Sequence, residues 1–584
     1  MAGQQEPMKE ALARIFQDLN IRAFRRQLAS IDSVPQFALL GIVAGAVTGV
    51  VIVAFRLAIE VPLLLFLPEN SDNFEGLPRL LAAVLPLVGS AFLALMVMSV
   101  AQDDRRVGIV HVLERLGRFQ GHLPSKNLIY QFVAGTVALA SGHSGGREGP
   151  AVHLGAACSS LLGQALKLPN NSIRVLVGCG TVAAISASFN TPVAGVIFSM
   201  EVIIMEYTIA GFIPVILAAV VAALVMMAVY GSAPAFEVPR LGMESFNDLP
   251  VLIAEGFAIG VIAAIFVYMI RRIYDVAPSS PAVRMLTAGL VTSLIALMVP
   301  QVMGIGYDTV NLSIEGNMTM TLLVAILVFK LIATSTTIAM GVPVGVIGPT
   351  LVIGAVAGGL VWVIAVETGM EISNPGLYAV LGMGAMMGAV LQAPLAALMA
   401  VMELTQNPSI ILPAMLVIVI ANITASQLFG VKSVFITQLE MQGIEFRQNP
   451  LSQALNRASV ASIMSRSFER VPAALPAEDA RNLASRAPTW LLVEDDQTPR
   501  FILRTEDLVN HVRENPGEEV RLSDIPATRK DVTGILLQAT LSEALERLNQ
   551  RGVQALYVNR ISAPLLDSPV GIVTREDIES YYQA

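Results

Sequence analysis

Long uncharged runs of apolar residues fill the first three quarters of the chain. A helix needs about 20 apolar residues to cross a bilayer, and several runs fit one crossing. Others, such as 331–366, are too long for one crossing and are interrupted by glycine and proline. This pattern predicts many membrane helices, some short or broken as in transporters and channels, unless glycine and proline only permit close packing. The stretches free of Asp, Glu, Lys and Arg are 36–55, 80–101, 127–146, 149–166, 175–200, 207–236, 285–307, 331–366, 372–402 and 408–431.

The last 135 residues follow a different pattern. From 450 to 584, apolar stretches of strand length alternate with polar stretches of helix length, and this part holds 34 of the 82 charged residues. The whole chain is 54% apolar and 14% charged, which excludes a disordered chain and argues against a wholly soluble one. We therefore expect an all-α, multi-pass membrane body followed by a soluble domain. The net charge of −8 argues against a nucleic-acid partner.

Residues 1–34 carry charges of both signs and no unbroken apolar core, so they do not resemble a signal peptide. An amphipathic cytoplasmic helix with Arg22, Arg25 and Arg26 near the membrane is the simpler prediction. The two cysteines lie in apolar stretches and are interpreted as helix-packing residues. With two cysteines and five histidines, no metal site is predicted.

The membrane body contains an internal repeat. Residues 146–156 and 345–355 are identical at five of eleven positions, including Gly-x-x-Gly-Pro and a glycine five residues after the proline. Downstream, each copy has a proline nine residues before a glutamate. These pairs are Pro192 with Glu201 and Pro394 with Glu403. Two landmarks at matched spacing predict two related halves, and inverted repeats are the common arrangement in transporters.

The repeated motif suits an anion. Proline is favoured at the first position of a helix, so Pro150 and Pro349 are each expected to open one, with Gly149 and Gly348 just before. A helix N-terminus offers free backbone N–H groups and a partial positive charge. Two such ends, one from each half, can hold an anion without a full positive charge, and conduction needs binding weak enough for release.

Glu148 lies in the first of these loops. A carboxylate in a membrane segment is costly and usually functional. Here it can compete with a permeating anion and move away when protonated. The alternatives are a salt bridge to Arg147 or a helix cap.

Four motifs in order resemble the CLC chloride channels and transporters. They are Ser-Gly-x-Ser-x-Gly-Arg-Glu-Gly-Pro at 141–150, Phe-Asn-Thr-Pro-x-Ala-Gly at 189–195, Gly-x-Gly-Tyr at 304–307 and Gly-x-x-x-Pro at 345–349. The resemblance covers roughly 35–445. It implies a CLC-type inverted-repeat fold, a homodimer with one anion pathway in each subunit, and both termini in the cytoplasm.

The resemblance also implies site residues. Glu148 matches the gating glutamate of the family. The positions that it implies for anion binding are Val107, Gly108, Ile109, Arg147, Gly149, Val346, Ile347 and Phe435.

Several of these positions depart from the family pattern. Val107 and Phe435 stand where the family has a serine and a tyrosine, so two hydroxyl donors are missing, and Ile347 replaces a phenylalanine. Backbone N–H groups of Val346 and Ile347 are then expected to contribute more. The inner proton-path position, directly after the one matched by Glu201, is Val202 as in the channel members, and Glu201 itself is interpreted as structural rather than as a proton relay.

These departures favour passive, gated conduction of chloride or another small anion. The alternative is a proton-coupled anion antiporter on the same fold, and a third possibility is a ligand-sensing membrane scaffold with a degenerate pore. We expect lipid contact and a location in the bacterial inner (plasma) membrane.

One enzymatic alternative exists. Gly142–Gly145 fits the Gly-x-Ser-Gly of intramembrane serine proteases, but after Ser144 the candidate bases are only His153 and His511. His153 is only nine residues on and is expected in the next helix, His511 lies in the soluble tail, and no later membrane helix offers a histidine, so no enzyme is predicted.

The tail resembles a cytoplasmic pair of CBS motifs at 450–584, about 456–515 and 520–584. Residues 501–508 parallel 571–578, each reading as a strand followed by a helix cap. Such pairs often bind adenine nucleotides, so the resemblance implies a possible nucleotide site and no required cofactor. The alternative is a dimerisation scaffold without ligand, because Arg504 replaces a threonine and capping alone explains the aspartates. The implied nucleotide-binding residues are Asp507, Thr574 and Asp577.

Overall fold

The structure is a computed structural model, and the chain divides into two compact units, a larger one of residues 1–167 and 173–446 and a smaller one of residues 447–584 together with 168–172. The helix predicted at 1–34 lies almost wholly outside the described residues. The described residues are 33–583 apart from 65–66, 68–72, 169, 206–208, 233–235, 237, 239–240, 445–454, 456–457, 496–497, 516–518, 538 and 562–566.

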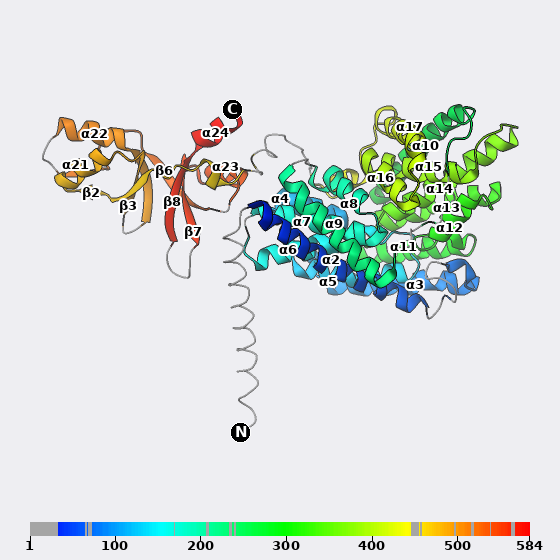
Figure 1. Ribbon diagram of the computed structural model, residues 1–584. Helices are drawn as coiled ribbons and strands as arrows, with labels where there is room; N and C mark the ends of the chain where they lie inside the picture. Colours follow the sequence, from blue (N-terminus) through cyan, green and yellow to red (C-terminus); the bar gives the residue numbers. More distant parts are fainter. Residues whose placement is uncertain are drawn as a thin grey trace, which may run out of the picture. The chain divides into compact units, whose positions relative to one another are not determined.

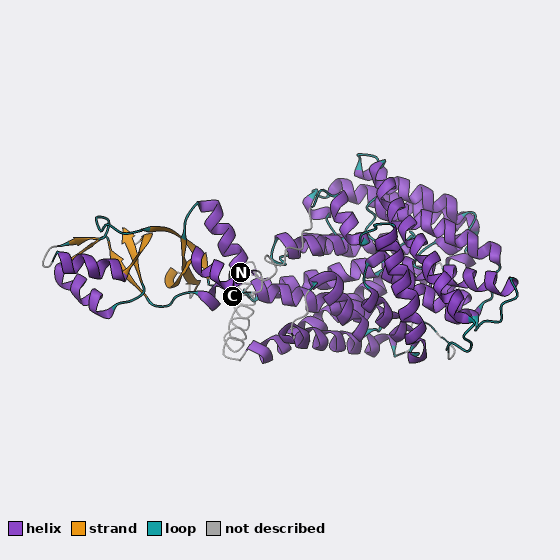
Figure 2. Cartoon of the chain, turned by 90° about the horizontal axis from the view of Figure 1, so that it is seen from above, coloured by secondary structure: helices purple, strands orange, loops and turns teal. Residues whose placement is uncertain are grey.

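The larger unit consists of helices and loops in its described part, whereas the strands lie in the smaller unit (Figure 2). Its helices are α2 (Ser33–Leu64), α3 (Arg79–Ser99), α4 (Gly108–Arg118), α5 (Ser125–Ala140), α6 (Glu148–Ala165), α7 (Asn170–Phe189), α8 (Pro192–Phe198), α9 (Ile209–Tyr230), α10 (Asp248–Asp275), α11 (Pro281–Ala296), α12 (Tyr307–Glu315), α13 (Met320–Ala339), α14 (Ile347–Glu367), α15 (Pro375–Leu391), α16 (Pro394–Thr405), α17 (Ile411–Ile423) and α18 (Val434–Met441). Short turns used below are η1 (Phe74–Gly76), η3 (Ser199–Ile204) and η4 (Pro300–Val302).

Among the described residues, eight helical segments are long and apolar enough to cross a membrane. They are Pro35–Leu64, Arg79–Ser99, Asn170–Phe189, Gly211–Tyr230, Asp248–Asp275, Met320–Ala339, Ile347–Glu367 and Pro408–Leu428. Four apolar helices are shorter, at Pro192–Ile204, Pro281–Ala296, Pro375–Leu391 and Pro394–Thr405. This mixture of full-length and short helices confirms the prediction of a multi-pass body with interrupted helices.

The sequence repeat is also a structural repeat, with α3–α8 followed by α11–α16 in the same order (Figure 1). In both halves, neighbouring helices cross so closely at glycine residues that there is no room for a side chain. A Cβ on Gly155 of α6 would lie 2.2 Å from the carbonyl oxygen of Gly180 on α7. In the second half, a Cβ on Gly354 of α14 would lie 2.2 Å from the carbonyl oxygen of Gly382 on α15. Small residues thus allow the backbones of neighbouring membrane helices to touch.

The smaller unit is α/β and consists of two copies of a β-α-β-β-α motif. In each copy the first two strands pair in parallel and the last two pair antiparallel, and an antiparallel β4–β6 contact joins the copies into one six-stranded sheet. Each copy has its own apolar core. This architecture is compatible with a CBS pair. The first copy is β1 (Phe468–Pro472), α21 (Ala477–Arg486), β3 (Trp490–Asp495), β4 (Thr498–Arg504) and α22 (Thr505–Glu514), and the second is β6 (Lys530–Leu536), α23 (Leu541–Arg551), β7 (Ala555–Ile561), β8 (Asp567–Thr574) and α24 (Arg575–Gln583).

Candidate functional site

The two repeated loops of the membrane body meet through their backbones. The N–H of Gly146 donates to the carbonyl of Gly345 at 2.8 Å, and the N–H of Gly345 donates to the carbonyl of Gly146 at 2.6 Å. A Cβ on Gly149 would lie 2.7 Å from Gly345 Cα. Only glycine fits where two backbones approach this closely. The crossing brings the start of α6 against the start of α14.

Both helices begin two residues earlier than the prolines suggest. α6 begins at Glu148 and α14 at Ile347, so Pro150 and Pro349 are each the third helical residue instead of the first. Proline is tolerated there because N–H groups in the first turn have no intrahelical acceptor. The earlier start makes Glu148 itself the first residue of α6.

The Glu148 side chain is fully buried and reaches into the other half of the protein. Its Oε2 accepts a hydrogen bond from the N–H of Gly348 at 3.2 Å, and its Oε1 accepts one from the Tyr307 hydroxyl at 3.1 Å. Gly348 is the second residue of α14, so the carboxylate lies at the positive end of that helix. The position is the one that an anion bound between the two helix N-termini would take.

A cavity of about 520 Å³ lies on the Gly149 side of the loop. The structure brings six of the eight predicted anion-binding positions together on its wall, and Gly108 already donates its N–H to Gln131 Oε1 at 2.9 Å. Arg147 lines a different cavity, and Ile347 borders a small apolar one. The six that line the large cavity are Val107, Gly108, Ile109, Gly149, Val346 and Phe435.

The charged residues on the wall of this large cavity are of one sign. Arg105, Arg106 and Arg284 line it, and none of its described lining residues is an aspartate or glutamate. Arg106 also pairs with Glu114 at 2.5 Å. A cavity lined by one sign of charge raises the local concentration of counter-ions, here anions.

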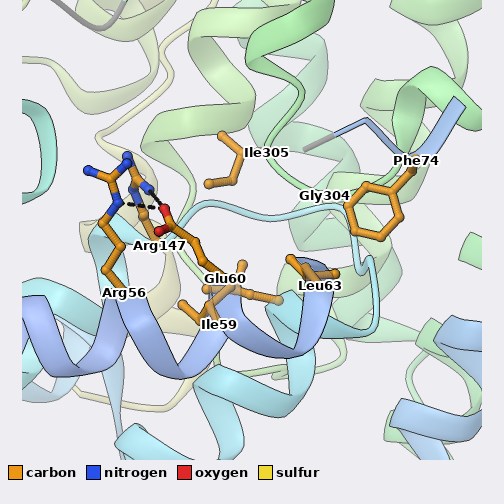
Figure 3. Close-up of a pocket in the computed structure, with 9 residues that line it drawn as sticks. Arg56, Ile59, Glu60, Leu63, Phe74, Arg147, Gly304 and Ile305 are labelled. Atoms are coloured by element: carbon orange, nitrogen blue, oxygen red, sulfur yellow. Dashed lines mark hydrogen bonds and ion pairs between the residues drawn. The ribbon is translucent and has the colours of Figure 1, made fainter. Parts of the chain in front are cut away.

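A smaller cavity lies on the Arg147 side, with space for about one water-sized particle. Figure 3 shows the guanidinium groups of Arg56 and Arg147 side by side, both directed at the carboxylate of Glu60 on α2. Glu60 Oε1 lies 2.5 Å from Arg56 Nε and 3.8 Å from Arg147 Nη1. Arg147 also donates to the carbonyl of Ser188 at 3.2 Å. Arg147 thus contacts Glu60 and Ser188 of the first half, and its guanidinium also lies 5.8 Å from the centre of the Tyr307 ring, whose hydroxyl bonds to Glu148.

Glu201 and Glu403 have matching structural contacts. Glu201 accepts hydrogen bonds from the N–H groups of Leu395 and Ala396 at the start of α16, at 3.4 and 2.8 Å. Glu403 accepts from the N–H groups of Val193 and Ala194 at the start of α8, at 3.0 and 2.7 Å. Each half therefore caps a helix of the other, which fits the interpretation of Glu201 as structural. Val202, beside it, is buried.

Two buried polar residues that sequence analysis missed hold the loops in front of the short helices. Gln131 on α5 accepts from the N–H of Gly108, the first residue of α4. Lys330 on α13 is fully buried and donates to the carbonyls of Val302, Gly304 and Ile305, at 3.0, 3.0 and 3.1 Å. Lys330 could have been identified from the sequence, because a single charge inside an apolar helix indicates a specific partner. Lys330 thereby positions the loop that leads to Tyr307.

A buried histidine pair links α4 to α6. Arg115 Nε donates to His111 Nε2 at 3.0 Å, which leaves His111 Nδ1 to donate to His153 Nε2 at 2.9 Å. Ser144 instead contacts the Thr334 hydroxyl at 2.8 Å. The serine and the histidine required by the protease alternative thus have other partners.

The predicted nucleotide residues of the smaller unit lie at helix starts. Asp577 accepts hydrogen bonds from the Thr574 N–H and hydroxyl at 2.8 and 2.7 Å, and the Thr574 hydroxyl accepts one from the Asp577 N–H at 3.2 Å, so the two residues together cap α24. Asp507 lies in the first turn of α22. Capping accounts for Asp577, and a nucleotide at this domain stays a prediction.

The membrane body matches the family model described as voltage gated chloride channel over residues 89–426. The chain belongs to this chloride channel (CLC) family. It is 29% identical over 364 residues to a putative chloride channel protein ClcB-like of Ralstonia nicotianae, covering 60% of this chain and 84% of the relative. It is 26% identical over 432 residues to the H(+)/Cl(−) exchange transporter ClcA of Salmonella arizonae, covering 71% and 90%.

Solved structures share the fold. A slow cyanobacterial Cl−/H+ antiporter matches with a TM-score of 0.61 and 21% identity over 71% of this chain and 99% of the other. A eukaryotic CLC transporter matches with a TM-score of 0.57 and 19% identity over 93% and 97%. The protein is thus an integral, multi-pass membrane protein of the CLC family, whose members are transporters and channels.

Proposed function

We propose that this CLC protein exchanges protons for chloride or another small monovalent anion. The observation that carries the proposal is the position of the Glu148 carboxylate, buried at the N-terminus of α14 and bonded to Gly348 and Tyr307. One group in that position can either block the anion or carry a proton, and exchange needs both. Relatives and structural neighbours named as proton/chloride or proton/fluoride antiporters support exchange more than the passive conduction predicted from Val202 and Phe435.

The cycle uses competition at one position. With Glu148 as a carboxylate, its charge fills the place between the two loops and excludes an anion. Protonation removes that charge, so the side chain loses its attraction to the helix end and an anion can replace it. The three arginines on the wall of the large cavity raise the local anion concentration, so that an anion is available next to Gly149 and Val346. Loss of the proton returns the carboxylate to its position and expels the anion.

The anion site itself relies on backbone donors. Val107 and Phe435 provide no hydroxyl, and the Gly108 N–H is occupied by Gln131. Ile347, as the first residue of α14, has no intrahelical acceptor for its N–H. Such a site binds weakly, which suits rapid release.

Glu148→Gln and Glu148→Ala test the gate. Both should raise anion flux at neutral pH in proteoliposomes and flatten its dependence on pH, because neither side chain can become an anion. Glu315→Gln, an exposed residue at the end of α12, is the control with the same charge change. A folded, conducting Glu148→Gln with an unchanged pH profile would remove Glu148 from the gate.

A separate measurement tests coupling. Proteoliposomes are given a chloride gradient and no pH gradient, and internal pH is recorded during flux. Exchange predicts proton movement opposite to chloride, against the proton gradient that it creates, and no such movement in Glu148→Gln. Chloride flux without proton movement would overturn exchange in favour of passive conduction.

A further inference from the structure

We propose that Arg56, Glu60 and Arg147 form a second anion-binding site in the small cavity on the Arg147 side of the gate. Glu60 holds the place of the anion in this site. The ligand is a small monovalent anion such as chloride. The proposal rests on anion transport and not on proton coupling.

The site is built from two elements that pack against each other. Arg56 and Glu60 lie one turn apart on α2, and Arg147 is the residue before α6. Figure 3 shows all three side chains converging, with ion-pair contacts drawn from both arginines to Glu60. Two guanidinium groups that converge on one carboxylate oxygen mark the position where negative charge is stabilised.

The geometry of the three side chains is fixed by further contacts. Glu60 Oε2 accepts a hydrogen bond from the Tyr230 hydroxyl at 2.9 Å. The Arg56 guanidinium lies 3.8 Å from the centre of the Tyr230 ring. Tyr230 therefore supports both the cation and the anion, and its hydroxyl can donate to any anion that replaces Glu60.

The charge of the cavity favours an additional anion. Its described lining contains two arginines and one glutamate, so the charged groups on its wall sum to +1, and the rest of the wall is apolar. The side chains of Arg56, Glu60 and Arg147 are 26%, 16% and 15% exposed. Partial burial lowers the local dielectric, so an entering anion interacts with these charges more strongly than in open water.

The cavity adjoins the gate. Arg147 precedes Glu148 in the chain, and Ile305 on the cavity wall lies 2.9 Å from where a Cβ on Gly348 would be. Gly348 is the donor to the Glu148 carboxylate. An anion in the small cavity is therefore one layer of residues from the place that Glu148 occupies. The pathway then has two positions in series, each held by its own glutamate.

Two single substitutions with opposite expected effects test the site. Glu60→Gln removes the competing charge, so the anion concentration for half-maximal flux should fall by on the order of tenfold. Arg56→Gln removes one of the two cations, so that concentration should rise by a similar factor. The measurements use the full-length protein in proteoliposomes with chloride, and Glu315→Gln is the control for net charge.

The opposite signs separate a binding site from a structural ion pair. If Glu60 and Arg56 only stabilise the fold, both variants should impair flux in the same direction and lower the melting temperature together. That outcome, or an unchanged half-maximal concentration in Glu60→Gln, would overturn the proposal. Because neither variant is scored by proton movement, failure here leaves the exchange proposal standing, and failure of exchange leaves this site standing.

Discussion

The first and second halves of the membrane body have the same backbone turn where they meet, but the turns carry different side chains. Each turn has a glycine, Gly146 or Gly345, followed by a helix whose third residue is proline. Between them, the first half has Arg147 and Glu148, and the second has Val346 and Ile347. One turn therefore carries both charges, and the other offers only backbone N–H groups.

The difference between the two halves distinguishes glutamates that hold helices in place from the glutamate proposed as the gate. Glutamates present in both halves, Glu201 and Glu403, cap helices of the opposite half by reciprocal contacts. Glu148 has no acidic counterpart, and its carboxylate lies where an anion would bind. In this repeat, the glutamates that the halves share hold helix ends, whereas Glu148, the proposed gate, is present in only one half.

The largest effect on stability is expected at Lys330, whose counterpart in the first half is not a lysine but Gln131. Lys330 and Gln131 occupy equivalent positions, since each precedes its repeated glycine (Gly345 or Gly146) by the same number of residues. Lys330→Met should remove the donor to three buried carbonyls, at a cost of about 1–3 kcal/mol for each one left unpaired. Thermal unfolding in detergent should rank wild type above Lys330→Gln, and Lys330→Gln above Lys330→Met. A Met variant as stable as wild type would contradict the role given to this lysine.

A hydroxyl at the N-cap of α4 should strengthen anion binding. Val107 and Gly306 are the N-caps of α4 and α12, the equivalent short helices of the two halves. A hydrogen bond to a charged group contributes roughly 1.5–3 kcal/mol, so Val107→Ser should tighten chloride binding by roughly 10- to 100-fold. Calorimetric titration measures this, and Val107→Ala controls for the lost volume. Equal affinities in the Ser and Ala variants would show that position 107 does not face the anion.

The two caps should behave as a matched pair. Glu201→Gln and Glu403→Gln should each lower the free energy of unfolding by roughly 0.5–2 kcal/mol, the usual range for a lost cap. Proton movement per chloride should be the same in both variants. If Glu201→Gln alone abolishes proton movement, the residue is a proton relay and the symmetry between the caps is only structural.

The smallest effect concerns a loop that the halves do not share. Glu75 lies in η1 between α2 and α3, whereas the loop from α10 to α11 contains no carboxyl. Burial, with a smaller contribution from Asp308, raises the pKa of Glu75 to about 7. The folded state then holds a proton that the unfolded state releases, so the contribution of Glu75 to stability is fully present below about pH 4.5 and is lost as pH rises through about 7. Melting temperatures measured across this range should fall less in Glu75→Gln than in wild type, and parallel curves would exclude the effect.

Sequence analysis predicted the elements that depend on local pattern. The repeated Gly-x-x-Gly-Pro, the apolar runs and the alternation in the tail led to the interrupted membrane helices, the two halves and the α/β domain. Glu148 could be singled out because a carboxylate inside an apolar segment is costly to bury and is retained mainly where it has a function. The prolines were placed two residues too close to the helix starts, because a third-position proline satisfies the same steric rule as a first-position one.

The missing parts of the site depend on contacts between distant segments. Nothing in the local sequence connects Tyr307 to Glu148, Glu60 to Arg147, or Gln131 to Gly108. Each contact joins different helices, and only tertiary packing brings them within hydrogen-bond or ion-pair distance: within the first half for Glu60–Arg147 and Gln131–Gly108, and between the halves for Tyr307–Glu148. The helices that carry these residues could be predicted, but their mutual rotation could not.

The paired hydrogen bonds between Gly146 and Gly345 fasten the backbones of the two halves to each other inside the membrane body. Rocking one half against the other would break both bonds and leave two N–H and two carbonyl groups unpaired in an apolar interior, so a large rigid-body movement is costly at this point. The movement that the proposed gate requires is then limited to the side chain of Glu148. In the proposed cycle, a turnover then needs only rotations about the side-chain bonds of Glu148, while the paired backbones of the two halves stay in place.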